Sequence, residues 1–135
     1  MSAAASWEPG TTLPPQTYRI TRADLAAYAA ASGDPNPIHL DEQVALAVGL
    51  PGVIAHGMYT LALAARAVST WSDDAPVLEL GAKFTAPVVV DAEQGAVVTV
   101  AGTVKDVADG VATLALDVRC GEGTVLGVPR ARIRV

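Results

Sequence analysis

The order of apolar and polar positions divides the chain into a helical first half and a stranded second half. Up to Trp71, apolar residues recur every three or four positions, which is the spacing of a buried helix face. From residue 77 onward they alternate with polar or small residues, as in strands that bury one face. The change of period near Ala75 predicts a helical layer followed by an antiparallel sheet.

The first helix has a clear start and a clear end in the sequence. Residues 21–24 match a capping box, with Thr21 as the N-cap and Asp24 reaching back to it. Gly33 ends the helix, and the two prolines that follow prevent it from resuming. Its apolar face is expected to consist of Leu25, Tyr28 and Ala29.

The longest apolar helical segment covers residues 56–71 and predicts a central helix from about Gly57 to Trp71. Spacings of three and four positions connect one set of apolar side chains, namely Met58, Leu61, Ala62, Ala65 and Val68. Other apolar residues lie between them, so we expect the helix to be enclosed on most sides. A shorter helix is expected at residues 40–47.

The remaining segments predict one sheet. Strands are expected at residues 17–20, 77–84, 88–90, 96–107, 111–120 and 124–135, with turns at 108–110 and 121–123. Residues 1–16 contain two adjacent prolines and are expected to form an extended entry segment. The whole chain, 1–135, is therefore predicted to be a single α+β domain, in which a curved antiparallel sheet of about five strands wraps one long helix. Such a sheet has open edges, and pairing of two edges into a dimer would cover one of them.

Composition excludes several classes of function. The chain has 135 residues and a net charge of -5, which argues against nucleic-acid binding because phosphates require a basic surface. It has no apolar run of about 18 residues, so no membrane-spanning helix is expected. The N-terminus lacks the basic and apolar regions of a secretory signal. The single cysteine, Cys120, cannot form an internal disulfide; it fits a cytoplasmic location and is interpreted as a packing residue.

The segment from residue 32 to residue 39, SGDPNPIH, interrupts the helical half and contains side chains that can take part in acid–base chemistry. Its prolines stiffen the loop that holds Asp34 and His39, so less entropy is lost in fixing the two side chains toward one point. Histidine accepts a proton near neutral pH and a carboxylate can orient water, so this pair is suited to activating a water molecule. Asn36 would brace the loop or orient the substrate. Asp and Asn also form ordinary Asx turns, so the loop alone leaves both interpretations open.

The second candidate feature is the start of the long helix, at residues 55–58. A helix N-terminus presents unpaired N–H groups, and Gly57 lets a ligand approach its N–H closely. If the loop lies over this helix start, one cavity would combine an activated water with a donor for developing negative charge. That arrangement suits the addition of water to a double bond conjugated to a thioester carbonyl. We interpret His56 as structural, and we expect no metal because a third histidine and a nearby cysteine are lacking.

These two segments resemble the MaoC-like family of hot-dog enzymes, the (R)-specific enoyl-CoA hydratases and (3R)-hydroxyacyl-ACP dehydratases, in their single-hot-dog form. Residues 28–39 match the family's hydratase motif, and residues 54–58 match its helix start. The resemblance implies reversible hydration of trans-2-enoyl thioesters, carried by CoA or acyl carrier protein, without cofactor. It implies either a homodimer or the active half of a heterodimer with a second hot-dog subunit. It assigns catalysis to Asp34, His39 and Gly57, and support or substrate binding to Ser32, Asn36, His56 and Met58.

Two other functions are weighed against hydration. A hot-dog thioesterase would share the fold and the thioester substrate, but would place its carboxylate near the helix start. A non-catalytic scaffold or partner subunit would not need the intact motif. Separately, Arg130, Arg132 and Arg134 alternate on the last predicted strand and share one face. They would attract the phosphates of CoA or an acidic carrier protein, or would form a solvated edge-strand face.

Overall fold

The protein is represented by a computed structural model, which describes residues 3–135. The helical elements, in chain order, are the 3-10 helix η1 (Ala3–Ser6), α1 (Arg22–Ser32), the 3-10 helix η2 (Pro37–His39), α2 (Glu42–Ala47) and α3 (Gly57–Ser72). The strands are β1 (Thr12–Ile20), β2 (Val77–Phe84), β3 (Ala96–Ala108), β4 (Val111–Cys120), β5 (Gly123–Thr124) and β6 (Leu126–Arg134). No helix within these residues combines the length and the apolar character needed to cross a membrane.

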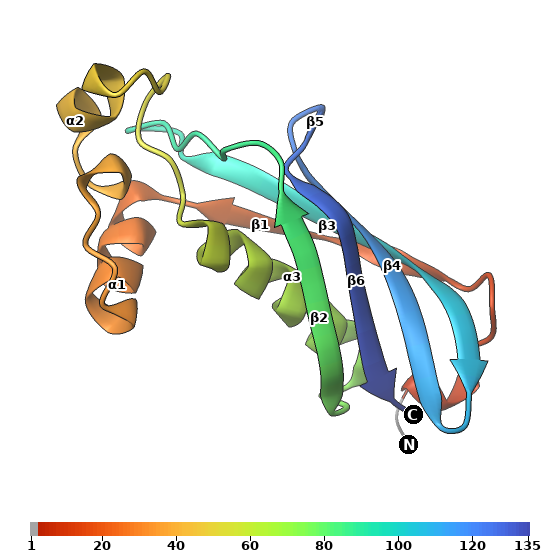
Figure 1. Ribbon diagram of the computed structural model, residues 1–135. Helices are drawn as coiled ribbons and strands as arrows, with labels where there is room; N and C mark the ends of the chain where they lie inside the picture. Colours follow the sequence, from red (N-terminus) through yellow and green to blue (C-terminus); the bar gives the residue numbers. More distant parts are fainter. Residues whose placement is uncertain (1–2) are drawn as a thin grey trace.

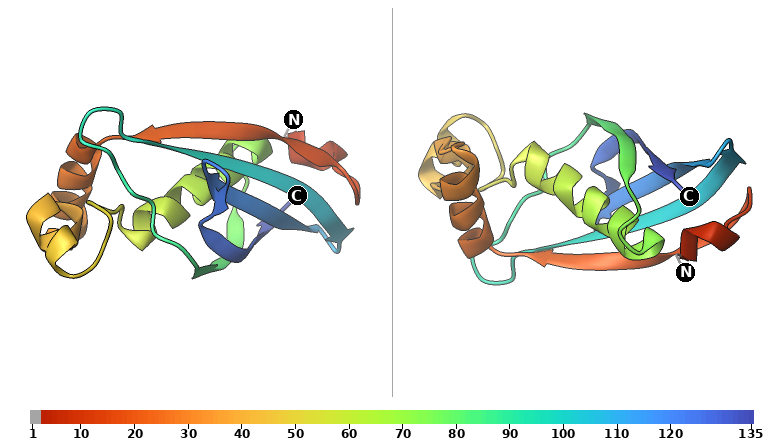
Figure 2. Two further views of the ribbon diagram at one scale, coloured as in Figure 1. Left: turned by 90° about the horizontal axis from the view of Figure 1, so that it is seen from above. Right: turned by 90° about the horizontal axis from the view of Figure 1, so that it is seen from below.

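The strands form one antiparallel sheet that curves around α3 (Figure 1). Its order is β1-β3-β4-β6-β2, and the short β5 pairs with the end of β4. Views from above and below show α3 crossing the inner side of the sheet, with α1 and α2 at one end (Figure 2). The prediction of an α+β fold, with one long helix wrapped by about five antiparallel strands, is confirmed.

Helix α1 begins and ends as the sequence predicts. The Thr21 hydroxyl accepts from the N–H of Asp24, and the Asp24 carboxylate accepts from the N–H of Thr21, which completes the capping box. Gly33 ends the helix in the left-handed region, at φ 76°, and its N–H bonds to the carbonyl of Ala29. The chain therefore leaves α1 in a fixed direction, which sets the position of the loop that follows.

Helix α3 starts at Gly57, as predicted, but its buried face is not the predicted one. The buried side chains of the helix are Thr60, Leu63, Ala64, Ala67, Val68, Trp71 and Ser72. Of the predicted face only Val68 is buried, while Met58 is 57% exposed. The helix is apolar on nearly every side, so periodicity could not decide which side meets the sheet. The helix is enclosed on most sides, as predicted, because only one stripe of it is exposed, at Gly57, Met58, Ala62, Arg66 and Thr70.

Strand β1 begins at Thr12, five positions before the predicted start, and includes the prolines that suggested an extended entry segment. The first residues of that segment form the 3-10 helix η1 instead. Proline interrupts a hydrogen-bond ladder, but β1 is an edge strand, where one side of the backbone has no neighbour. The register of β1 against β3 shifts between Leu13 and Gln16, which is where the prolines lie.

Residues 88–90 do not form the predicted strand. They make local bridges to the segment that enters α3: the N–H of Val90 bonds to the carbonyl of Val53, and the N–H of Ala55 to that of Val88. The run of three valines there reflects the burial of Val88 and Val90 rather than membership of the sheet. These bonds fix the direction from which the chain enters α3, so they help to position the residues at its start.

The last two strands differ from the prediction in extent and place. The predicted strand at residues 124–135 is divided into β5 and β6, and β6 lies between β4 and β2 rather than at an edge. The arginine face on β6 is therefore an outer face of the sheet, not an edge. Glu79 of β2 pairs there with Arg130 and Arg132, at 3.5 and 3.6 Å. By contrast, β4 has the predicted bounds, and Asp109 and Gly110, both at positive φ, form the predicted turn before it.

Candidate active site

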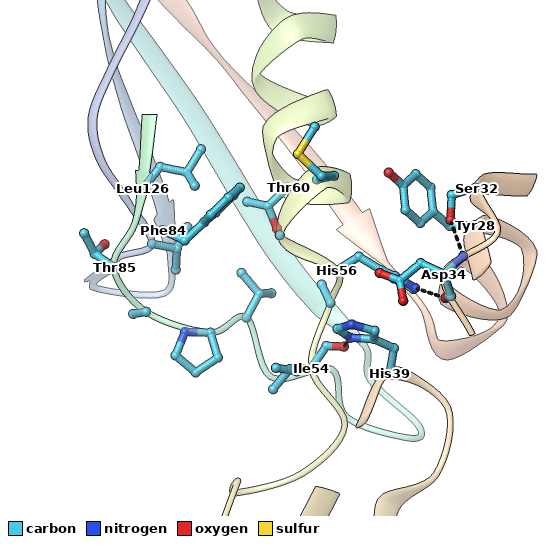
Figure 3. Close-up of a pocket in the computed structure, with 17 residues that line it drawn as sticks. Tyr28, Ser32, Asp34, His39, Ile54, His56, Thr60, Phe84, Thr85 and Leu126 are labelled. Atoms are coloured by element: carbon cyan, nitrogen blue, oxygen red, sulfur yellow. Dashed lines mark hydrogen bonds between the residues drawn. The ribbon is translucent and has the colours of Figure 1, made fainter. Parts of the chain in front are cut away.

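A cavity of about 700 Å³ opens between the loop after α1, the start of α3 and the ends of β2 and β6. Every site residue predicted from the sequence lines it except Asn36. The side chains of Asp34, His56 and Ser32 gather on one wall, with Phe84 and Leu126 on the opposite side (Figure 3). The loop thus lies beside the helix start, which is the juxtaposition that the sequence argument required.

Three polar side chains stabilise the loop by the same local hydrogen bond. Ser32 Oγ accepts from the N–H of Asp34 at 3.3 Å, Asp34 Oδ1 from that of Asn36 at 3.3 Å, and Asn36 Oδ1 from that of Ile38 at 3.2 Å. Each bond spans two positions, as in Asx and related turns. The turn chemistry weighed as an alternative is therefore present, and it holds Asp34 at the cavity. Asn36 braces the loop but does not line the cavity.

His39 is buried, at 7% exposure, and its ring has a defined orientation. Its Nδ1 lies 2.7 Å from the carbonyl oxygen of Ile54. Because a carbonyl oxygen can only accept, Nδ1 must carry the proton, and in the neutral ring Nε2 keeps its lone pair. Ile54 belongs to the segment that residues 88–90 hold in place. The ring is therefore fixed by the backbone as a proton acceptor at Nε2.

His56 connects the loop to the start of α3. Only 1% of it is exposed, and its Nε2 donates to the backbone carbonyl of Asp34 at 3.1 Å. Its ring stacks on that of His39, with centroids 3.9 Å apart, and the ring of Tyr28 meets it edge-on at 4.8 Å. Its Nδ1 is buried and has no hydrogen-bond partner among the described residues. These contacts agree with the interpretation of His56 as a structural residue.

The aromatic cluster extends outward from His56 through Tyr28. Tyr59, on the first turn of α3, meets the ring of Tyr28 edge-on, with centroids 5.2 Å apart. Burial raises the pKa of the Tyr59 hydroxyl, and the nearby carboxylate of Asp24 raises it further. Tyr59 therefore stays neutral at physiological pH. Its contact with Tyr28 joins the first turn of α3 to α1, the helix that precedes the loop of residues 33–39.

Three titratable side chains at the cavity have a spacing that one water molecule can bridge. A carboxylate oxygen of Asp34 and one ring nitrogen each of His39 and His56 lie within 4.8 Å of one another. Two partners of a single water, at ordinary hydrogen-bond lengths and a tetrahedral angle, lie about 4.6 Å apart. The same three groups do not suit a metal chelate, because stacked imidazole rings direct their lone pairs along separate planes. The arrangement therefore favours a held water.

Gly57 supplies a hydrogen-bond donor to the same cavity. It is the first residue of α3, and no backbone carbonyl within residues 3–135 accepts from its N–H. The N–H groups of Tyr59 and Thr60, by contrast, both bond to the carbonyl of His56. The free N–H lies at the positive end of the helix dipole, which favours an oxygen with developing negative charge.

Several lining residues were not identified from the sequence. Tyr28 was noted only as part of the first helix's apolar face and of the motif, and Thr60 only as part of the long helix. Phe84 and Leu126 belong to β2 and β6, and the topology of the sheet brings them to the start of α3. One signal was available, because Phe84 is the only phenylalanine in the chain. Neither Cys120 nor the arginines of β6 line the cavity.

Comparison with known proteins places most of the chain in one group. A family model described as a MaoC-like domain matches residues 5–119. A curated relative from Mycobacterium tuberculosis, 3-hydroxyacyl-thioester dehydratase X, is 39% identical over 82 residues, which are 61% of this chain and 29% of the relative. This chain therefore spans less than a third of that protein.

Solved structures give the same grouping. A MaoC-like dehydratase superposes with a TM-score of 0.92 at 34% identity, covering 96% of this chain and 41% of that one. An (R)-hydratase from A. caviae involved in PHA biosynthesis superposes with a TM-score of 0.85 at 27% identity, covering 96% of this chain and 98% of that one. The second match covers nearly all of a chain that is therefore similar in length to this one.

Proposed function

This chain belongs to the MaoC-like family, and from that premise we propose that it reversibly adds water to trans-2-enoyl thioesters to give (3R)-hydroxyacyl thioesters. The observation that carries the proposal is the meeting of Asp34, His39 and Gly57 at one cavity, with the acid and base groups at a water-bridging distance. A solved structure with the same fold is named an (R)-hydratase, which supports the (3R) configuration proposed for the product.

The proposed reaction uses the chain's own groups. A water held between Asp34 and His39 loses a proton to His39 Nε2 as its oxygen bonds to C3 of the substrate. The electrons of the double bond move toward the thioester carbonyl, whose oxygen accepts from the N–H of Gly57. The proton then passes through the catalytic pair to C2. The hydroxyl on C3 and the hydrogen on C2 together account for the whole water molecule. Stabilisation of the enolate by one such donor is typically worth about 3 kcal/mol.

The substrate is proposed to be an acyl thioester of CoA or of a carrier protein, because both present the same thioester to the catalytic groups. The acyl part would lie among the apolar lining residues, which include Val88 and Leu126. A cytoplasmic location stays a prediction from the single cysteine.

We expect the purified chain to consume a short enoyl-CoA. Hydration removes the conjugated double bond, so the ultraviolet absorbance of the thioester should fall while no free thiol appears. The measurement is a paired assay of absorbance and thiol release. Thiol release would instead favour a hot-dog thioesterase, and a chain without either activity would contradict the proposal for the isolated chain. Activity that appears only after a second hot-dog subunit is added would favour the heterodimer.

We further propose that the chain forms a homodimer through the outer edge of β2. This strand exposes Val77 and Leu78, and its edge has no partner strand within the described chain. Antiparallel pairing of two copies about Gly81 would place Glu79 opposite the partner subunit's Lys83, so the edge is complementary to itself in charge. Light scattering at micromolar concentration is expected to give twice the mass of the chain. A stable monomer would contradict this prediction.

A further inference from the structure

Phe84 lies directly over the start of α3. It ends β2, it is 58% exposed, and it lines the cavity. A Cβ added to Gly57 would lie 3.0 to 3.2 Å from three atoms of the Phe84 ring, which is closer than ordinary van der Waals contact. Figure 3 shows this ring on the wall that faces the catalytic loop. The Phe84 ring therefore fills the space that a larger side chain at position 57 would need.

We propose that Phe84 is a positioning residue, which covers the N-terminus of α3 and holds the thioester against the N–H of Gly57. This inference rests on the proposed hydration. Phe84 is not one of the groups proposed to move protons; it acts through the donor that it covers. Nothing in the sequence motif points to it, because it lies 27 positions after Gly57 on the other side of the cavity.

The backbone does not explain why residue 57 is glycine. Gly57 is not among the glycines with positive φ, so any L-residue could adopt its conformation. At the first position of a helix, alanine would also be a better helix former than glycine. The restriction is the space occupied by the Phe84 ring. We infer that Gly57 and Phe84 are a matched pair, with the small residue making room for the large one.

The ring has a consequence for the donor beneath it. A hydrogen bond to a developing oxyanion is strongest where water is excluded, because the local dielectric is low. The N–H of Gly57 lies at the edge of an open cavity, and water would compete for it. An apolar ring against the same backbone excludes that water.

The contact between Gly57 and Phe84 is tested by melting temperatures alone, without an activity assay. We expect Gly57→Ala to lower the melting temperature of the wild-type protein, because the new methyl group displaces the ring. In a Phe84→Ala background the same change should have no cost or should raise the melting temperature, because the methyl group then has space and alanine favours the helix. Additive effects of the two substitutions would overturn the matched pair.

The positioning role is tested by kinetics. We expect Phe84→Ala to lower kcat for a short enoyl-CoA about tenfold and to raise KM. This fall in kcat is smaller than the loss of about 10²–10³ expected if the donor itself were removed. Phe84→Leu should restore most of the rate, because it restores an apolar cover. Leu46→Ala is the matched control, since Leu46 is also large, apolar and 53% exposed but does not line the cavity; it should leave both constants unchanged.

The outcomes separate this inference from the proposed function. Wild-type hydration together with unchanged kcat and KM in Phe84→Ala would leave the proposed function intact and overturn the positioning role. A fall in rate that followed only a loss of folded protein, with no rescue by leucine, would also overturn it. Absence of hydration in the wild-type chain would sink the proposed function, and the positioning role with it, even if the stability coupling between Gly57 and Phe84 were found.

Discussion

His39→Ala is expected to lower kcat for hydration by about 10²–10⁴-fold, the range that one general base contributes. Nδ1 of His39 is committed to the carbonyl of Ile54, so Nε2 is the nitrogen that can take a proton from water. Asp34→Ala should cause a comparable loss, because the carboxylate is the other partner of that water. Steady-state rates with a short enoyl-CoA measure both effects, and circular dichroism checks that each variant is folded.

Conservative variants separate chemistry from structure at these two positions. His39→Asn can still donate to Ile54 but has no basic nitrogen, so it should be as inactive as alanine while keeping more of the stability. Asp34→Asn keeps the shape of the side chain and removes its charge. If both residues act on one water, the double variant should lose little more than the worse single one. Near-normal turnover in any of these folded variants would show that the loop only turns the chain and that Asp34 and His39 do not activate water.

The sequence predicted those parts of the fold that local rules determine. The capping box at Thr21, the stop at Gly33 and the turn at Asp109 depend on residues a few positions apart, and all three are confirmed. Alternation was sufficient for β4, because one face of that strand is buried along nearly its whole length. In each case a short segment contains the physical cause of its own structure.

The errors occurred where the cause lies elsewhere in the chain. The prolines of β1 are tolerated because the strand is at an edge, and edge position depends on the order of the whole sheet. The buried face of α3 depends on which side the sheet covers. In the cavity, Asp34 and His39 came from one motif, but Phe84 and Leu126 reach it through strand pairing. No local pattern in the sequence shows that these strands bring Phe84 and Leu126 to the cavity.

The second large effect is expected from substitution of His56, because this residue joins the proposed catalytic loop to the start of α3. His56→Ala removes a ring stacked on His39 and leaves the carbonyl of Asp34 without its donor. Loss of a buried ring and of a buried hydrogen bond together should lower the free energy of unfolding by about 3 kcal/mol. Because an error of about 1 Å in placing reacting groups can cost about 100-fold, hydration should fall by roughly that factor in the protein that remains folded.

Two further variants distinguish positioning by His56 from direct proton transfer. His56→Phe keeps a ring against His39 but cannot donate to Asp34, whereas His56→Gln can donate but cannot stack. If His56 positions the loop, each should retain part of the activity, and activity should rank with stability in chemical denaturation. The pH profile of kcat should also keep its shape, because the proton acceptor, His39, is unchanged. A His56→Phe protein as stable as wild type but as inactive as His39→Ala would show instead that His56 itself carries a proton.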